Sequence, residues 1–192
     1  GQVFSYRGAS YAIPLLGEHQ LHNAATVLEA VSVLRKLGWD IDDEAVESGL
    51  YSVAWPARFE VLHTDDPWFV LDGGHNPQCA AALRECLEHY FPDSKRVALV
   101  GVLKDKDYKS IAATLAPLFD ACVCVTPPSE RALPAEELAE LFKDSCREVC
   151  VADTVEDGVD LARDIAQEQD AMVCAFGSLY ICGQIRSCFG LR

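Results

Sequence analysis

The sequence has no long apolar run and few cations. No apolar stretch approaches the roughly 20 residues that a helix needs to span a bilayer, and the start lacks the basic-then-apolar pattern of a secretory signal peptide. We therefore expect no membrane association. Lys and Arg number 16 against 30 Asp and Glu, so the formal net charge is −14. Because nucleic-acid binding needs clustered cations, the composition argues against a nucleic-acid partner. Any anionic ligand must be held by a few local cations.

The Cys-x-x-Cys spacing is also absent. The chain has nine cysteines, an odd number, and none of them forms a Cys-x-x-Cys pair. This scatter predicts neither a disulfide framework nor a zinc site. Cys122 and Cys124 are two positions apart in an apolar segment and so face one side of a predicted strand, and Cys174 lies in another apolar segment. The cysteines are interpreted as small buried apolar residues in a reducing compartment, which predicts a cytoplasmic protein.

The chain does contain a regular alternation of apolar segments and amphipathic segments after residue 55. With 192 residues and 50% apolar composition it can bury a full core. The alternation predicts βαβ units in an α/β fold, a Rossmann-like three-layer sandwich with a mostly parallel sheet. The first two strands are separated only by Thr64 to Pro67, which predicts an antiparallel hairpin at the edge. Strands are predicted over residues 59–63, 68–72, 96–102, 121–126, 148–152 and 171–176, and helices over 78–90, 108–118, 135–143, 155–167 and 179–189.

The first 54 residues have a different pattern. An extended apolar stretch is predicted over residues 11–16, followed by an amphipathic helix over 20–37 that Gly38 ends and a shorter helix over 43–50. This segment has too little predicted sheet for a separate domain. Residues 1–54 are therefore interpreted as the end of a domain that lies upstream, with the hinge near Pro56, and residues 55–192 as the α/β domain.

Residues 70–77 form the most informative motif, Val-Leu-Asp-Gly-Gly-His-Asn-Pro. An apolar strand is followed at once by polar side chains, two glycines and a proline that suits the first position of a helix. The motif gathers Asp72, His75 and Asn76 at the carboxyl end of a strand, where open α/β sheets bind ligands. An ordinary strand-to-helix turn with polar caps explains the motif about equally well.

Four further motifs occur with this one in a fixed order. The series resembles the C-terminal part of folylpolyglutamate synthase, including the bifunctional form that is also a dihydrofolate synthase, within the Mur ligase superfamily. The resemblance covers almost the whole chain. The chain departs from the usual pattern at two positions: it has Ala57 where the family usually has Gly, and Gly74 where the family usually has Ala. The five motifs are Leu-Gly-Glu-His-Gln-x-x-Asn-Ala-Ala at 16–25, Trp-Pro-Ala-Arg-Phe-Glu at 55–60, Asp-Gly-Gly-His-Asn-Pro at 72–77, Asp-Lys-Asp at 105–107 and Phe-Gly-Ser-Leu-Tyr at 176–180.

The resemblance implies an ATP-dependent ligase that joins glutamate to a folate carboxylate. ATP would phosphorylate the carboxylate, and the amine of glutamate would attack the acyl phosphate. The implied ligands are ATP, Mg²⁺, L-glutamate and a reduced folate or dihydropteroate, bound by a monomer. The chain has no Gly-x-x-x-x-Gly-Lys-[Ser/Thr] loop, and the family's metal ligands and modified lysine belong to an upstream domain. We therefore expect this chain to be a C-terminal portion without activity of its own.

The resemblance also implies three nucleotide contacts. Asn23 resembles the asparagine that hydrogen-bonds the adenine, for which a carboxamide offers both a donor and an acceptor. Arg58 resembles the arginine that reaches the ATP phosphates and stabilises the transferring phosphoryl group. Asp72 resembles the aspartate that accepts hydrogen bonds from the ribose. Each of two residues also has a purely structural explanation. Asn23 could be an ordinary polar residue near a helix N-terminus, and Arg58 could form a surface ion pair.

Glutamate binding is implied at two other motifs. His75 and Ser178 resemble residues of the glutamate pocket, with Tyr180 nearby, and His75 is the candidate that handles the proton of the amine. The alternatives are that His75 caps the helix after Asp72 and that Ser178 is the N-cap of the helix over 179–189. The charged residues 104–107 follow a strand at the same sheet edge and either shape this site or form a solvated run. Replacing Asp72 or His75 is expected to leave the fold intact.

Three other functions have to be weighed against this one. A UDP-muramyl amino-acid ligase of the same superfamily would share the fold and the ATP contacts, although the motifs at 55–60 and 176–180 are of the folate type. A nicotinamide oxidoreductase would need Gly-x-Gly-x-x-Gly in its first strand-to-helix turn, and Asp-Gly-Gly-His does not match it. A non-catalytic interaction module is the third possibility.

Overall fold

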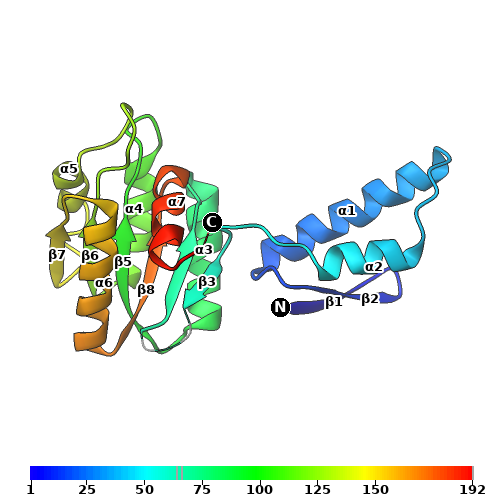
Figure 1. The fold of residues 1–192 in the computed structure, drawn as a ribbon, viewed down its shortest axis with the longest axis horizontal. Coiled ribbons are helices and arrows are strands. Elements are labelled where there is room, and N and C mark those ends of the chain that lie inside the picture. The colour runs from blue at the N-terminus through cyan, green and yellow to red at the C-terminus, as the bar shows by residue number, and fades with distance from the viewer. Residues whose placement is uncertain (64, 66, 192) are drawn as a thin grey trace. The chain divides into compact units, whose positions relative to one another are not determined.

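The computed structural model describes residues 1–63, 65 and 67–191. The chain forms two compact units, Gly1–Pro56 and Ala57–Arg192 (Figure 1). None of the helices within the described ranges is both long enough and apolar enough to cross a membrane.

The first unit begins with a β-hairpin that the sequence pattern did not reveal. Strands β1 (Gln2–Tyr6) and β2 (Ala9–Ile13) pair antiparallel. Arg7 (φ 49°) and Gly8 (φ 86°) form the two-residue turn between them, with the positive φ angles that a tight hairpin needs. The extended stretch predicted over residues 11–16 is therefore wrong in its bounds, because the strand ends before Pro14, and β1 was missed as its partner.

Two helices complete this unit. Helix α1 (Glu18–Lys36) corresponds to the prediction over 20–37, and Gly38 follows it with φ 92°, as expected for a C-terminal stop. Helix α2 (Asp43–Tyr51) is capped by Asp42, whose Oδ1 accepts a hydrogen bond from Ala45 N at 2.6 Å. The hairpin and both helices share a small apolar cluster of Ile13, Ala24, Leu28, Val46 and Leu50.

The second unit is built on a six-stranded sheet with the order β3-β4-β8-β5-β6-β7. β3 pairs antiparallel with β4, and all the other neighbours are parallel. The predicted Rossmann-like α/β fold and its antiparallel edge hairpin are thus confirmed, while the connecting residues Thr64 and Asp66 lie outside the described residues. The strands are β3 (Glu60–His63), β4 (Phe69–Asp72), β5 (Lys95–Val100), β6 (Ala121–Cys124), β7 (Glu148–Val151) and β8 (Ala171–Phe176).

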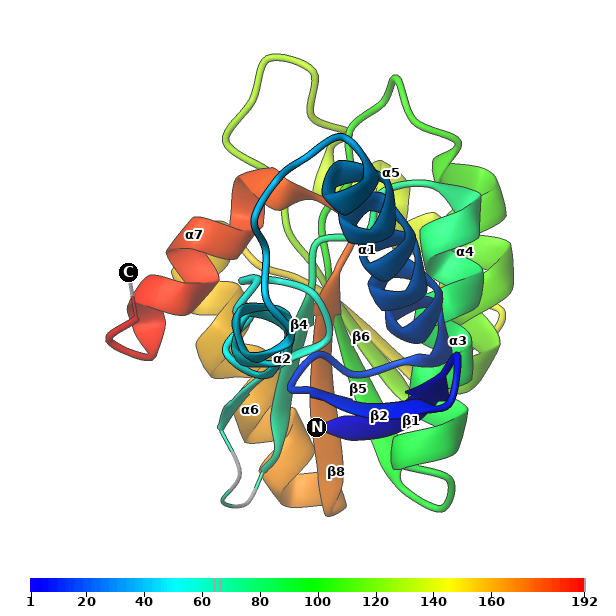
Figure 2. The same cartoon turned by 90° about the vertical axis from the view of Figure 1, so that its right-hand side faces the viewer.

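Helices cover both faces of this sheet, which gives three layers. Figures 1 and 2 show α6 and α7 on one face and α3 and α4 on the other, and α5 packs against β6 and β7. The central strands are buried on both sides, so β4, β6 and β8 consist of buried residues throughout. The helices are α3 (Pro77–Tyr90), α4 (Tyr108–Leu115), α5 (Ala135–Glu140), α6 (Val155–Gln169) and α7 (Leu179–Cys188).

Two helices end earlier than predicted. The helix expected over 108–118 stops at Leu115 and continues as a short 3-10 helix, Ala116–Leu118, because Pro117 has no N–H for the α-helical pattern. The helix expected over 135–143 is α-helical only to Glu140.

The strand register decides which loops meet. Asp72 at the end of β4 pairs with Phe176 at the end of β8, and Phe176 also pairs with Val100 at the end of β5. The loops after these three strands therefore leave the same edge side by side. The chain goes from β4 to α3 on one face and from β8 to α7 on the other. The edge between β4 and β8 is thus a topological switch point, the usual ligand site in this kind of sheet.

Candidate active site at the carboxyl edge of the sheet

Asp72 ties two turns together at this edge. Its side chain is buried, with 8% exposure. Its Oδ2 accepts a hydrogen bond from Phe59 N at 2.9 Å, and its Oδ1 accepts one from Gly74 N at 2.7 Å. Gly73 N donates in turn to Ala57 O at 2.8 Å. Residues 57–60 are therefore fixed against the end of β4, and the Asp72 carboxylate is the main polar group that holds them there.

Arg58 lies in a strained turn beside Asp72. Its neighbours Ala57 (φ 54°) and Phe59 (φ 43°) both adopt the left-handed conformation that non-glycine residues rarely use, a kind of strain that is common at functional sites. The half-buried guanidinium donates through Nη1 to Ala57 O at 3.1 Å. Among the described residues no carboxylate lies within ion-pair distance of Arg58, so the surface-ion-pair alternative finds no partner there.

Gly73 brings Arg58 close to the start of α7. A Cβ atom at this position would lie 2.4 Å from Leu179 Cδ2 and 3.2 Å from Arg58 Nη1. Glycine permits this close approach because it has no Cβ. The turn after β4, the turn that carries Arg58 and the N-terminus of α7 therefore meet at one place.

His75 is held by the backbone of the same turn. Its Nδ1 lies 3.2 Å from Gly73 O. A carbonyl oxygen can only accept a hydrogen bond, so this contact places the proton on Nδ1 and leaves the Nε2 lone pair of the neutral ring as the base. The helix cap is the next residue, since Asn76 Oδ1 accepts from Cys79 N at 2.8 Å. The alternative that His75 caps α3 is therefore wrong.

Ser178 begins α7 as the N-cap, as its structural alternative predicted. Its side chain is 2% exposed, and its Oγ accepts from Tyr180 N at 3.2 Å. Gly177 before it has φ 109°, and a Cβ there would come within 2.7 Å of Gly101 O. Only glycine suits this position, which packs the start of α7 against the loop after β5. The role of Ser178 toward glutamate remains a prediction.

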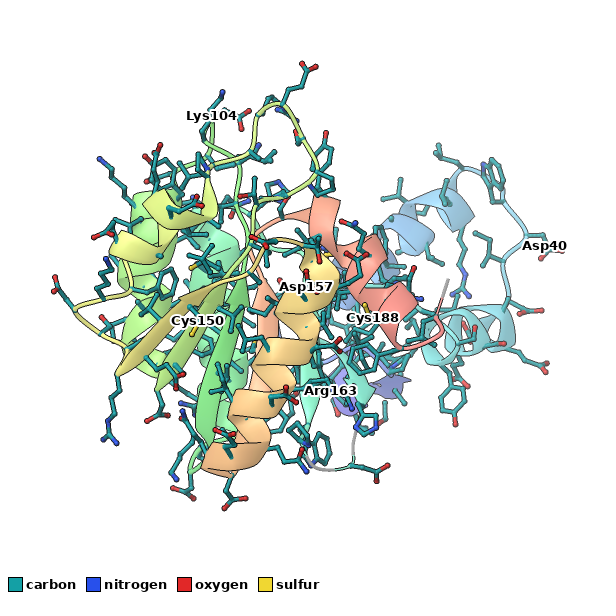
Figure 3. The ribbon with its side chains drawn as sticks, turned by 60° about the vertical axis from the view of Figure 1, so that its left-hand side comes forward. Asp40, Lys104, Cys150, Asp157, Arg163 and Cys188 are labelled. Atoms are coloured by element: carbon teal, nitrogen blue, oxygen red, sulfur yellow. The ribbon has the colours of Figure 1, made fainter. Side chains whose placement is uncertain are left out.

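The charged residues 104–107 and Arg131, which the sequence analysis did not predict, also lie at this edge of the sheet. Lys104 is exposed on the loop after β5 (Figure 3), and Asp107 caps α4 through Ser110 N at 3.2 Å. Arg131, on the loop after β6, contacts both Asp105 and Tyr180. Sequence reasoning missed Arg131 because no motif contains it. The available signal was its position in a loop that follows a parallel strand.

Asn23 belongs to the first unit. It is exposed on α1, and its Nδ2 donates to Gln20 Oε1 at 3.0 Å. Its carboxamide oxygen and second N–H are the groups that an adenine would need. The adenine contact remains a prediction.

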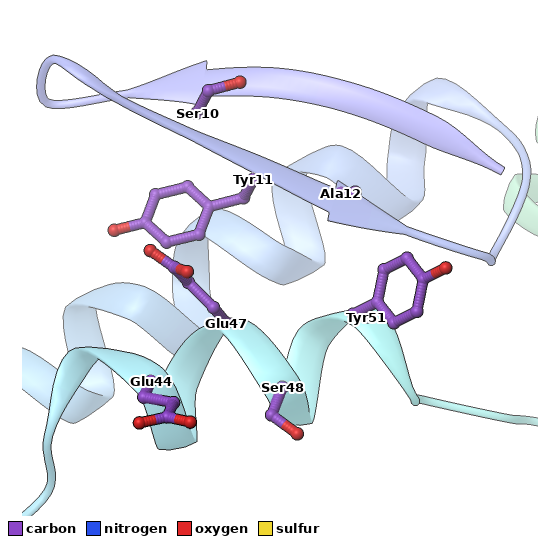
Figure 4. A pocket seen from close by; sticks show the side chains of 7 residues that line it. All are labelled: Ser10, Tyr11, Ala12, Glu44, Glu47, Ser48 and Tyr51. Carbon is purple, nitrogen blue, oxygen red and sulfur yellow. The ribbon is translucent and has the colours of Figure 1, made fainter.

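A groove of about 390 Å³ lies between β2 and α2 of the first unit (Figure 4). Its lining contains two carboxylates, Glu44 and Glu47, and two tyrosines, Tyr11 and Tyr51. Acidic walls disfavour an anionic ligand such as a nucleotide, and none of the predicted site residues lines the groove. The sheet edge, rather than this groove, carries the candidate site.

The described residues provide no cluster of metal ligands at this edge, and burial keeps several thiols of the second unit protonated. No group of three or more His, Cys, Asp or Glu side chains in the described part of the chain is arranged to hold a metal ion. These residues therefore do not fit a Mg²⁺ site. Burial raises the pKa of Cys86 and of Cys182 to about 12 and that of Cys146 to about 11. These thiols stay protonated near neutral pH and are poor nucleophiles.

The fold and this edge define a class, a Rossmann-like α/β domain with a polar site at its topological switch point. Residues 57–179 match the family model for the Mur ligase, glutamate ligase domain. Because this match covers most of the chain, the chain belongs to the Mur ligase family through that domain.

Similar proteins extend the match into the first unit. A Mycobacterium tuberculosis dihydrofolate synthase/folylpolyglutamate synthase is 34% identical over 99% of this chain and 43% of its own length. The structure of M. tuberculosis folylpolyglutamate synthase with ADP and AMPPCP superposes with a TM-score of 0.85 at 33% identity, covering 96% of this chain and 43% of that one. A bifunctional folylpolyglutamate synthase/dihydrofolate synthase with Mn, AMPPNP and L-glutamate gives 0.73 at 29% identity, covering 97% and 44%.

These matches confirm the resemblance to folylpolyglutamate synthases. The chain spans less than half the length of these relatives.

Proposed function

We propose that this chain serves as the C-terminal part of an ATP-dependent ligase that adds glutamate to folate through an acyl phosphate. The observation that carries the proposal is the joining of the Arg58 turn to the Asp72–His75 turn at the switch point of the sheet. Family membership and nucleotide-bound relatives support it. A reduced folate is the proposed acceptor, with dihydropteroate as a second acceptor and Mg²⁺ bound by residues outside this chain.

Arg58 is the proposed phosphate ligand. A guanidinium has five N–H donors, and Arg58 uses one for Ala57 O. No carboxylate among the described residues lies within ion-pair distance of Arg58, so its other N–H groups are available to an anion. The fixed turn holds the guanidinium in place before the phosphate arrives, which is what stabilisation of a transferring phosphoryl group requires.

Asp72 is the proposed ribose ligand. Each carboxylate oxygen has two lone pairs, and each already accepts one backbone N–H. A ribose hydroxyl can therefore donate to a remaining lone pair while the turns stay tied. Asn23 is the proposed adenine contact, through its free carboxamide edge.

His75 and the start of α7 are the proposed glutamate site. The Nε2 lone pair of His75 can take a proton from the ammonium group of glutamate, which produces the amine that attacks the acyl phosphate. Ser178 begins a ten-residue helix, and the N–H groups and dipole of a helix start attract a carboxylate. Tyr180, in the first turn of α7, is the further proposed contact. A cytoplasmic monomer is the proposed form of the protein.

A ligase assay of the full-length protein tests this function. Purified enzyme is incubated with ATP, Mg²⁺, L-glutamate and tetrahydrofolate, and mass spectrometry follows the gain of one glutamate together with ADP release. Parallel reactions with dihydropteroate and with a UDP-muramyl precursor separate the folate reactions from the sister ligase reaction. Glutamate added only to the UDP-muramyl precursor, or to no acceptor, would overturn the proposal.

The isolated chain provides a second test. Because residues 1–192 have no P-loop, we expect no turnover and very weak ATP binding. Calorimetric titration that gives micromolar ATP affinity for the isolated chain would contradict this expectation.

A further inference from the structure

The loop after β6 is fastened to the loop after β5 beyond the carboxyl ends of the strands. Lys104 N donates to Arg131 O at 2.9 Å, and Leu133 N donates to Val102 O at 3.0 Å. Both loops rise above the sheet edge (Figure 2). Arg131 therefore has a fixed backbone position although it lies in a long, exposed connection.

The guanidinium of Arg131 is fixed as well. Its Nη1 lies 2.7 Å from Asp105 Oδ2, on the loop after β5, and its Nη2 donates to the Tyr180 hydroxyl at 3.2 Å, at the start of α7. The guanidinium carbon lies 6.0 Å from the centre of the Tyr180 ring, within the range of a cation–π contact. The loop after β5 and the first turn of α7 thus each supply one partner for this cation, whose side chain stays 51% exposed.

The remaining donors of this cluster suit a carboxylate. Arg131 has five N–H groups and uses one for Asp105 and one for Tyr180, so three are left. Because the Tyr180 oxygen accepts from Arg131, its own O–H can donate to another group. An arginine and a hydroxyl that are already in place can bind a planar anion without losing further side-chain entropy.

The charges around Arg131 come from the same loops. Lys104, Lys106 and Arg131 carry three positive charges, and Asp105, Asp107 and Glu130 carry three negative charges. The two loops are therefore neutral overall, in a chain with a net charge of −14. A neutral segment repels an anionic substrate less than the rest of this acidic chain does.

The geometry points to Arg131 and Tyr180 as the clamp for the side-chain carboxylate of the incoming glutamate, with Asp105 as a positioning residue. This inference rests on the proposed function. The amine has to reach the acyl phosphate near Arg58 and His75 at the strand ends. The γ-carboxylate lies three carbons from the carbon that bears the amine, so the outer loop that carries Arg131 is suited to it.

Steady-state kinetics of the full-length enzyme test the clamp. Arg131→Ala is expected to raise the KM for L-glutamate at least tenfold and to change the KM for ATP less than twofold. Tyr180→Phe removes only the hydroxyl and is expected to raise the KM for L-glutamate about threefold to tenfold. The matched control is Arg84→Ala, because Arg84 is also an exposed arginine paired with a carboxylate, Glu88 at 2.9 Å, but lies on α3. The control is expected to leave both constants unchanged.

The preference of the enzyme for glutamate over glutamine shows whether Arg131 binds the substrate or only holds the loops together. L-Glutamine keeps the α-carboxylate and replaces the γ-carboxylate with a neutral amide. The preference for glutamate over glutamine in kcat/KM is expected to fall at least tenfold in Arg131→Ala. If Arg131 only holds the loops together and does not contact the substrate, its replacement would lower kcat/KM equally for glutamate and glutamine and leave their ratio unchanged.

The outcomes distinguish this inference from the proposed function. A wild-type enzyme that adds no glutamate to folate removes the proposed function and the clamp together. An active wild-type enzyme with an unchanged glutamate KM, or an unchanged glutamate-to-glutamine ratio in Arg131→Ala, overturns the clamp alone. Thermal unfolding of each variant identifies a folding defect, and Tyr180→Phe then decides the inference.

Discussion

Replacing Asp72 tests whether the candidate site depends on one buried carboxylate. The sequence alone suggests a harmless substitution, since no large apolar group is lost. The structure suggests the opposite. Asp72 is 8% exposed, and its two oxygens accept from Phe59 N and Gly74 N at 2.9 and 2.7 Å. Asp72→Ala leaves both backbone donors without this partner.

The size of the effect follows from these two hydrogen bonds. A hydrogen bond to a charged group contributes about 1.5–3 kcal/mol, and a buried donor left without a partner costs about 1–3 kcal/mol. Two such donors give an expected loss of about 3–5 kcal/mol in the free energy of unfolding. Asp72→Asn keeps one acceptor oxygen but turns an NH₂ group toward the other donor, so we expect about half of this loss.

Urea unfolding of the chain measures the loss directly. With a slope of about 2 kcal/mol per molar urea, Asp72→Ala is expected to lower the midpoint by about 2 M and Asp72→Asn by about 1 M. Asp144→Ala removes an exposed aspartate of the same unit and is the control, with an expected shift of less than about 0.3 M. If the urea midpoint of Asp72→Ala equals that of the control, the structural role of Asp72 is refuted and nucleotide binding is left as its main role.

Four further predictions concern catalysis, backbone strain and pH. In the full-length enzyme, Arg58→Ala is expected to lower turnover about a hundredfold at saturating ATP, a loss of roughly 3 kcal/mol from the barrier, with an unchanged melting temperature; near-normal turnover would contradict the phosphate role. His75→Ala is expected to raise the glutamate KM or lower turnover without changing the ATP KM, which initial-rate kinetics with each substrate varied can check. Ala57→Gly relieves a φ of 54° and is expected to stabilise the chain by about 0.5–1 kcal/mol in urea unfolding; a lower midpoint would argue against strain. Burial raises the pKa of Cys86 and of Cys182 to about 12, so unfolding releases their protons above pH 9, and the free energy of unfolding from urea titrations should fall between pH 9 and 11 by about 1.4 kcal/mol per pH unit for each thiol; an unfolding free energy that does not change over this range would refute the shifts.

Local patterns were sufficient to predict the elements of the second unit. Apolar strands alternating with amphipathic helices determine both the element types and the mostly parallel sheet. Because parallel strands end at one edge, the sequence also placed Asp72, His75, Ser178 and the loop at 104–107 together, and the register between β4, β8 and β5 agrees. The hairpin of the first unit was missed because β1 alternates between half-buried and exposed residues and has no strong apolar face.

The functional details depended on contacts that no local pattern contains. The carboxylate of Asp72 accepts from the backbone of Phe59, 13 positions away, in a turn whose non-glycine residues adopt positive φ angles. Arg131 meets Tyr180 across 49 positions, and only the strand order brings their loops together. Asn76, rather than His75, caps α3, a difference decided by side-chain direction at neighbouring positions.

The sequence by itself determined the fold class and the sheet edge that carries the candidate site, because hydrophobic periodicity and the direction of parallel strands are properties of short segments. The tertiary structure alone decided which polar atoms at that edge already have partners and which donors remain for a ligand. Hydrogen-bond pairing is directional and operates within about 3 Å, so it depends on where distant turns pack, and the order of residues does not specify that packing in any local way.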